Sequence, residues 1–158
     1  MNISIISVGK LKEKYLKDAI GEYTKRLSRF AKVEIIEIPD QKIPDNASQK
    51  ECESILLKEG EQILSKIKTN SFVISMCIEG ELVSSEELAN LIQKTSMTKS
   101  SICFIIGGSL GLSDAVKKRA DKKISFGRIT LPHQLMRVVL LEQIYRAFKI
   151  NANENYHK

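Results

Sequence analysis

The chain has 158 residues, a formal charge of +6, 42% hydrophobic residues and 28% charged residues. This length suits one domain over residues 1–158, and the ordinary composition argues against a disordered or low-complexity protein. The sequence shows neither an apolar run long enough to span a membrane nor the pattern of a secretory signal. We therefore expect a cytoplasmic protein with no membrane partner.

Charge and cysteine usage limit the kinds of partner and site. A basic chain favours a polyanion such as nucleic acid, although many soluble proteins are basic and charge alone leaves the question open. Cys52, Cys77 and Cys103 lie far apart, and only His133 and His157 could join them as soft ligands. This spacing argues against a zinc site or a disulfide framework, and we expect no metal.

Short apolar or β-branched runs alternate with helical patterns along the chain. Such alternation predicts an α/β fold with a mostly parallel sheet and helices on both faces. The predicted strands are Ile3 to Val8, Val33 to Ile38, Phe72 to Cys77, Ile102 to Ile106, and Lys123 to Phe126.

The predicted helices lie between these strands. Apolar residues at three- and four-residue spacing predict a first helix from about Leu11 to Ala31. Ser48 with Glu51, and Ser84 with Glu87, form two capping-box patterns, each of which marks the start of a further helix.

The last predicted helix, Gln134 to Ile150, is apolar on more than one side. A second, shorter apolar stripe ends in Glu142 and Arg146, which are i,i+4 neighbours on a helix. A helix that is apolar nearly all round needs cover on both sides, either from its own sheet or from a second subunit.

The loop after the fourth predicted strand is rich in glycine and reads Gly107-Gly108-Ser109-Leu110-Gly111-Leu112-Ser113-Asp114. Glycines permit close approach of the backbone to a ligand, and Ser113 fits the N-cap of a short helix. As a nucleotide-binding signature the loop is weak, because it matches neither common phosphate-binding motif.

The same loop also suggests a serine hydrolase, because Gly107-x-Ser109-x-Gly111 has the spacing of a nucleophile elbow. With Ser109 as nucleophile, the acid and the base would follow in the expected chain order. The candidate acids are Asp114 and Asp121, and the candidate bases are His133 and His157. The helix is expected to begin several residues after Ser109, which weighs against an elbow.

The loop after the fifth predicted strand runs from Phe126 to His133, with Pro132 at a first-turn position of the last helix. An extended segment of this kind offers backbone donors and acceptors that suit the edge of an adenine ring. Just before it lies the densest basic stretch of the chain, which either forms a solvated helix face or attracts a phosphodiester backbone. This stretch comprises Lys117, Lys118, Arg119, Lys122, Lys123 and Arg128.

Motifs spread over the whole chain resemble the SPOUT methyltransferases, and most closely the ribosomal RNA large subunit methyltransferase H family. The order and spacing of the fragments make the resemblance specific. The matching segments are Val8-Gly9-Lys10-Leu11-Lys12, Gly80 with Ser84-Ser85-Glu86, Phe104 to Ser109 with Gly111-Leu112, Thr130 with Pro132-His133, Arg137-Val138, Glu142 to Ala147, and Tyr156-His157-Lys158.

The resemblance implies a fold, an assembly and a reaction. The expected fold is a parallel-sheet α/β knot, in which the C-terminal part threads a loop to form a deep trefoil knot, and the expected assembly is a homodimer. The expected reaction transfers the methyl group of S-adenosylmethionine to N3 of a pseudouridine in a 23S ribosomal RNA hairpin loop, on the assembled ribosome. A non-catalytic RNA-binding protein that has kept the fold remains an alternative.

The resemblance also implies which residues act. Cofactor contacts are expected from Met76, Gly107, Phe126, Gly127, Arg128, Ile129, Thr130 and Leu131. Arg146 is expected near the target base, where a guanidinium could stabilise a developing anion or hold a phosphate. Tyr156 and His157 are expected to reach the partner's site, with Glu142 orienting Arg146.

The sequence departs from the family's pattern at Met76-Cys77, Gly127 and Asn155. Methionine is a mild replacement at an apolar position. We expect Gly127 and Asn155 to loosen the cofactor loop and the tail.

Overall fold

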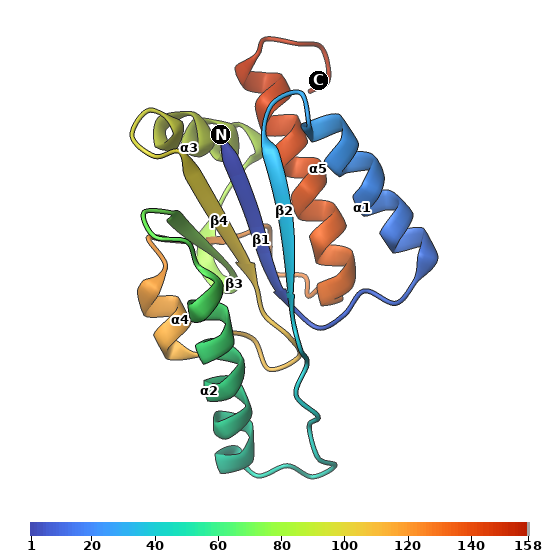
Figure 1. Ribbon diagram of the computed structural model, residues 1–158, viewed down its shortest axis with the longest axis vertical. Helices are drawn as coiled ribbons and strands as arrows, with labels where there is room; N and C mark the ends of the chain where they lie inside the picture. Colours follow the sequence, from blue (N-terminus) through green and yellow to red (C-terminus); the bar gives the residue numbers. More distant parts are fainter. Residues whose placement is uncertain (158) are drawn as a thin grey trace.

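The computed structural model describes residues 1–157, which form a sheet of five parallel strands flanked by helices (Figure 1). The strand order is β2-β1-β4-β3-β5. The strands are β1 (Asn2–Val8), β2 (Lys32–Ile38), β3 (Phe72–Leu82), β4 (Ser101–Ile106) and β5 (Lys122–Ser125). The predicted strands and their parallel pairing are confirmed.

The helices cover both faces of the sheet. They are α1 (Lys14–Leu27), α2 (Gln49–Lys66), α3 (Ser85–Ser96), α4 (Asp114–Arg119) and α5 (His133–Asn151). Buried residues of α1, α3 and α5 join one hydrophobic cluster, and those of α2 and α4 join the other. Successive side chains of a strand point to opposite faces, so in β1 Ile3 and Ile5 enter the first cluster while Ile6 and Val8 enter the second.

Polar side chains start three of the helices as the capping patterns predict. Ser48 accepts a hydrogen bond from the Glu51 N–H at the start of α2. Ser84 and Glu87 form a reciprocal capping box at α3, with each side chain accepting from the other residue's backbone N–H. Ser113 accepts from the Val116 N–H and so begins α4.

Two helix boundaries differ from the prediction. The predicted first helix, residues 11–31, is too long, because α1 begins at Lys14 and ends at Leu27. The Leu11 N–H bonds the Glu37 carboxylate at 2.7 Å instead of entering a helical turn. Pro132 is the N-cap of α5, one position earlier than the first-turn position predicted for it.

An irregularity in β3 distorts the edge of the sheet next to β5. Met76 and Glu81 of β3 both lie opposite Ile124, so the residues between them bulge out of the ladder. Gly80 lies in this bulge against β5. A Cβ added at Gly80 would lie 2.6 Å from the carbonyl carbon of Ile124, closer than real Cβ atoms come.

We predict that Gly80→Ala destabilises the protein by about 1–3 kcal/mol, because the added methyl group forces the bulge away from β5. The measurement is the free energy of unfolding in urea. Gly21→Ala is the matched control, since a Cβ at this helical glycine meets nothing within 4 Å. Gly21→Ala should raise the free energy of unfolding by about 0.5–1 kcal/mol. Equal stability of the two variants would contradict the packing described for Gly80.

Candidate functional site

A cavity of about 540 Å³ opens where β3, β4 and β5 end and α5 begins. This is the edge of a parallel α/β sheet at which ligands bind. The lining residues are Met76, Cys77, Ile78, Glu79, Ile106, Gly107, Gly108, Ser109, Leu110, Gly111, Leu112, Lys117, Ile124, Ser125, Phe126, Gly127, Ile129, Thr130, Leu131, His133 and Met136.

The glycine-rich loop forms one wall of the cavity as a tight turn. The Gly111 N–H donates to the Gly108 carbonyl at 3.0 Å, which closes the turn. A Cβ at Gly107 would lie 2.4 Å from the Gly111 carbonyl oxygen, so a side chain there is incompatible with this turn. At Gly107 and Gly108 the backbone itself therefore lines the cavity.

The loop from Phe126 to Leu131 forms the opposite wall. Gly127 has a φ of +141°, which L side chains rarely adopt, and its N–H donates to the Ser125 hydroxyl at 3.2 Å. From Arg128 to Leu131, the backbone forms no hydrogen bond with other backbone groups of residues 1–157. These free donors and acceptors fit the predicted binding of an adenine edge.

Seven of the eight predicted cofactor residues line the same cavity. They are Met76, Gly107, Phe126, Gly127, Ile129, Thr130 and Leu131. Arg128 differs, because its side chain is exposed and does not line the cavity.

Three lining residues, Ile78, Glu79 and Met136, are not predicted by the sequence. Ile78 and Glu79 lie in the β3 bulge, beyond the predicted end of the strand at Cys77. Met136 lies on the first turn of α5, directly after His133 and the predicted adenine-binding loop. Met136 could have been predicted from the sequence, because it lies only three residues beyond that loop.

The predicted catalytic residues form a second cluster around Glu142. One carboxylate oxygen of Glu142 accepts from Arg146 Nη2 at 2.7 Å, from Arg146 Nε at 3.1 Å and from the Tyr156 hydroxyl at 3.1 Å. The Arg146 guanidinium also lies over the Tyr156 ring, 4.7 Å from its centroid. Glu142 therefore orients both residues.

His157 extends this cluster to α3. Its Nδ1 lies 3.4 Å from Arg146 Nη1, and its Nε2 lies 2.7 Å from the Glu86 carboxylate. A guanidinium can only donate, so Nδ1 must accept and the ring proton belongs on Nε2, from which it is donated to Glu86. Neutral His157 in this tautomer satisfies both contacts.

Tyr156 anchors the C-terminal tail on α5. Its ring packs edge-on against Tyr145, with centroids 5.0 Å apart. Burial, followed by the nearby Glu142 carboxylate, raises the pKa of Tyr156. The phenol therefore stays protonated at neutral pH and acts as a hydrogen-bond donor.

The cavity lies at the start of α5, whereas the Glu142 cluster lies along the middle and the C-terminal half of this helix. Met136 lines the cavity, whereas Arg146 is ten residues further along the helix. At 1.5 Å per residue, this separation is about 15 Å along the axis. Within one chain the structure does not bring the two predicted groups of site residues together.

Arg137 holds the first turn of α5 in place beside the cavity. Its side chain is 1% exposed and bonds the Glu37 carboxylate at 2.9 Å and the Val8 and Gly9 carbonyls at 3.2 and 2.6 Å. Glu37 in turn accepts from the Leu11 N–H. One guanidinium thus joins α5 to the ends of β1 and β2.

The loop does not have the geometry of a nucleophile elbow. Ser109 is exposed in the tight glycine turn, and α4 begins only at Asp114. An elbow instead leads directly from the strand through the serine into the helix. No hydrogen bond joins Ser109 to either histidine within residues 1–157.

Half of the basic stretch is neutralised by neighbouring carboxylates. Lys117 pairs with Glu79, Arg119 with Asp121, and Lys122 with Glu81. Lys118, Lys123 and Arg128 are exposed and form no ion pair within the described residues. These three side chains carry most of the stretch's free positive charge.

Within residues 1–157, no group of three or more His, Cys, Asp or Glu side chains is placed to hold a metal ion. No helix there is both long and apolar enough to cross a membrane.

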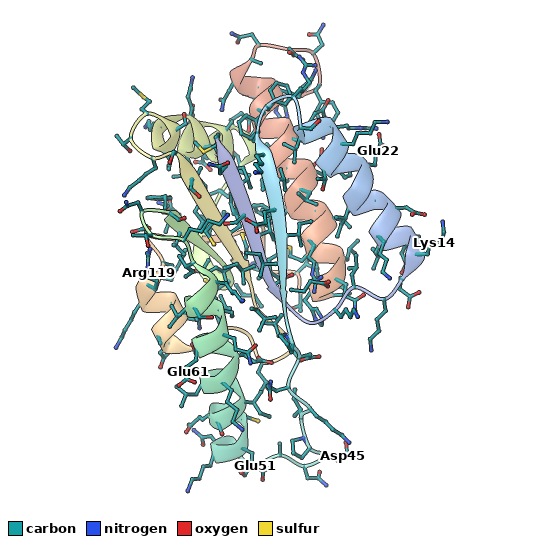
Figure 2. All side chains as sticks on the ribbon, in the orientation of Figure 1. Lys14, Glu22, Asp45, Glu51, Glu61 and Arg119 are labelled. Carbon is teal, nitrogen blue, oxygen red and sulfur yellow. The ribbon has the colours of Figure 1, made fainter. Side chains whose placement is uncertain are left out.

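We predict that Arg137→Met lowers the free energy of unfolding by about 2–3 kcal/mol, because it leaves the carbonyls of Val8 and Gly9 without their buried donor. Urea denaturation measures this change. Lys14→Met is the control, since Lys14 projects into solvent from α1 and its pair with Asp18 is exposed (Figure 2). A loss no larger than that of the control would show that Arg137 does not hold α5.

Comparison with known proteins identifies the family. The family model described as "Predicted SPOUT methyltransferase" matches residues 1–157. The chain is 60% identical to ribosomal RNA large subunit methyltransferase H of Bacillus pumilus, and 60% to that of Clostridioides difficile. It is 61% identical to ribosomal RNA large subunit methyltransferase H 1 of Clostridium perfringens, and all three alignments cover the full length of both proteins. The chain therefore belongs to the SPOUT methyltransferase family, among the ribosomal RNA large subunit methyltransferase H proteins.

Proposed function

We propose that this protein methylates large subunit ribosomal RNA with S-adenosylmethionine as methyl donor. The proposed target is N3 of a pseudouridine in a 23S ribosomal RNA hairpin loop, on the assembled ribosome. The observation that carries the proposal is full-length identity of about 60% to the methyltransferase H proteins. The cavity at the carboxyl edge of the sheet supports it, because the predicted cofactor residues gather there.

The cavity suits S-adenosylmethionine in size and chemistry. About 540 Å³ is within the range of pockets that hold molecules of this size. The free backbone groups from Arg128 to Leu131 would bind the adenine edge, and apolar side chains such as Ile106 and Leu112 would contact the ring. When bound, the cofactor supplies an electrophilic methyl group, and we expect the reaction to need no metal.

We propose that the active site is completed by a second copy of the chain. Arg146 lies about 15 Å along α5 from its own cavity, which is too far for direct contact with a base bound there. In a two-fold dimer with antiparallel α5 helices, the Arg146 end of one helix lies beside the cavity of the other. Leu135, Val138 and Val139 remain partly exposed on α5 and would be covered by such a partner.

Arg146 is the proposed catalytic residue. Removal of the N3 proton leaves negative charge on the imide, and an oriented guanidinium stabilises that charge as it develops. Glu142 and Tyr156 hold Arg146 in place before the RNA arrives. His157 Nδ1 is occupied by Arg146, so it could accept the proton only after that contact breaks, and water remains the alternative acceptor.

We propose that Lys118, Lys123 and Arg128 contact RNA phosphates. Their charge is not neutralised within the described residues, and α4, β5 and the loop that carry them all border the cavity. Arg128, which does not line the cavity, fits this role better than cofactor binding. Each phosphate contact should add to the salt dependence of RNA affinity.

The trefoil knot is part of the proposal as well. The chain leaves β5 at one edge of the sheet and returns through residues 126–132 to α5, which packs against α1 and α3. A loop that crosses in this way and also lines the cavity is consistent with a threaded C-terminal part. Such threading is an exception to the usual absence of knots.

Cofactor binding is the first test of the proposed function. Calorimetric titration with S-adenosylmethionine should show saturable binding at about one site per chain, and light scattering should show a dimer at micromolar concentration. Absence of binding together with labelling of Ser109 by a phosphonate would instead support a hydrolase. Ribosome affinity without any methyl transfer would support the non-catalytic RNA-binding alternative.

We predict that Arg146→Ala binds S-adenosylmethionine normally but transfers the methyl group about a hundredfold more slowly, because the developing charge loses its oriented donor. The measurement is methyl transfer to ribosomes that lack the modification. Lys68→Ala, which breaks an exposed pair with Glu34, is the control. Turnover at the wild-type rate in Arg146→Ala would remove Arg146 from the mechanism.

A further inference from the structure

The β3 bulge exposes consecutive residues to the cavity. In a regular strand, alternate side chains point to opposite faces, so neighbours do not share one pocket. Here Met76, Cys77, Ile78 and Glu79 all line the cavity, because the ladder with β5 is interrupted after Met76. The bulge thereby brings a carboxylate from the sheet edge to the rim of the proposed cofactor site.

Glu79 pairs with Lys117 in the wall of the cavity. Among the lining residues of the described chain, Glu79 carries the only carboxylate and Lys117 the only lysine ammonium. The two side chains form an ion pair that joins the β3 bulge to the last turn of α4. All other lining side chains are apolar or hydroxylic, except Cys77 and His133.

Both partners of this pair are charged at neutral pH. The hydrogen bond from Lys117 lowers the pKa of Glu79, and the same bond raises the pKa of Lys117. The Lys117 side chain is 29% exposed and that of Glu79 is 56% exposed. The pair is thus held at the rim with one side open, where a ligand can approach both charges.

Adjacent opposite charges complement a zwitterion. S-adenosylmethionine carries an α-carboxylate and an α-ammonium group on one carbon, whereas its adenosine part is uncharged. We propose that the Glu79–Lys117 pair binds the amino-acid end of the cofactor, with Lys117 contacting the carboxylate and Glu79 the ammonium group. This inference rests on the proposed function and assigns charged contacts that the loop from Phe126 to Leu131 does not supply.

The same pair is less suited to an RNA phosphate. A phosphate placed against Lys117 would also meet the Glu79 carboxylate, and like charges at this distance repel. A zwitterion avoids this conflict because its ammonium group faces the carboxylate. Charge complementarity therefore favours the cofactor over the RNA as the ligand of this pair.

Calorimetric titration of charge-neutral variants tests the assignment. Glu79→Gln and Lys117→Met should each weaken binding of S-adenosylhomocysteine, which keeps the zwitterionic end, by about tenfold. Neither variant should change binding of methylthioadenosine, which has the nucleoside but no amino-acid end. Glu81→Gln and Lys122→Met are matched controls, since they break a similar Lys–Glu pair between β3 and β5 that does not line the cavity.

Three other outcomes would overturn the inference. Unchanged affinity for S-adenosylhomocysteine in both variants would show that the pair does not touch the cofactor. Equal losses for S-adenosylhomocysteine and methylthioadenosine would place the contact on the nucleoside instead. If the wild-type protein binds neither ligand nor S-adenosylmethionine, the proposed function itself fails, and this inference fails with it.

Discussion

The buried guanidinium of Arg137 is the contact on which the geometry of the cavity depends. It bonds Glu37 and the carbonyls of Val8 and Gly9, so it fixes the first turn of α5 against the carboxyl ends of β1 and β2. A buried arginine is costly to desolvate and is stable only when its donors are satisfied. Among residues 1–157 its Nε has no hydrogen-bond partner, which costs some stability. The turn held in this way contributes His133 and Met136 to the cavity.

Because α5 is one continuous helix that is held at its first turn, its other end lies far from its own cavity. The polar cluster of Glu142, Arg146, Tyr156 and His157 is assembled there before any RNA binds, with each donor already aimed. A guanidinium oriented in this way can stabilise charge on a substrate placed against it. In the proposed dimer, a two-fold axis would place each polar cluster at the partner's cavity. Cofactor binding and charge stabilisation would then come from different chains.

Local patterns predicted much of this structure. The alternation of apolar runs predicted all the strands of the described sheet, and Ser48, Ser84 and Ser113 predicted helix starts because capping depends on neighbouring residues alone. The β3 bulge was not predicted, since it involves the pairing of β3 with β5 and the close approach of Gly80 to Ile124, which is distant in sequence. Arg137 was recognised only as part of a motif, because nothing local marks an arginine as buried. The seven cofactor residues could be predicted only from the family resemblance. The ion pairs that neutralise half of the basic stretch could be identified only from the structure.

The central claim is that two chains share each active site, and mixing of two inactive variants tests it most directly. Gly107→Val should distort the glycine turn that walls the cavity, because its side chain would meet the Gly111 carbonyl, and Arg146→Ala should remove the catalytic guanidinium, so each homodimer should be inactive while still dimerising. After the two are mixed and allowed to exchange subunits, half of the dimers are mixed and each has one intact site, which predicts about a quarter of the wild-type methyl-transfer rate. If mixed dimers form and the rate stays at the level of the parent variants, the site does not combine the cavity of one chain with Arg146 of the other.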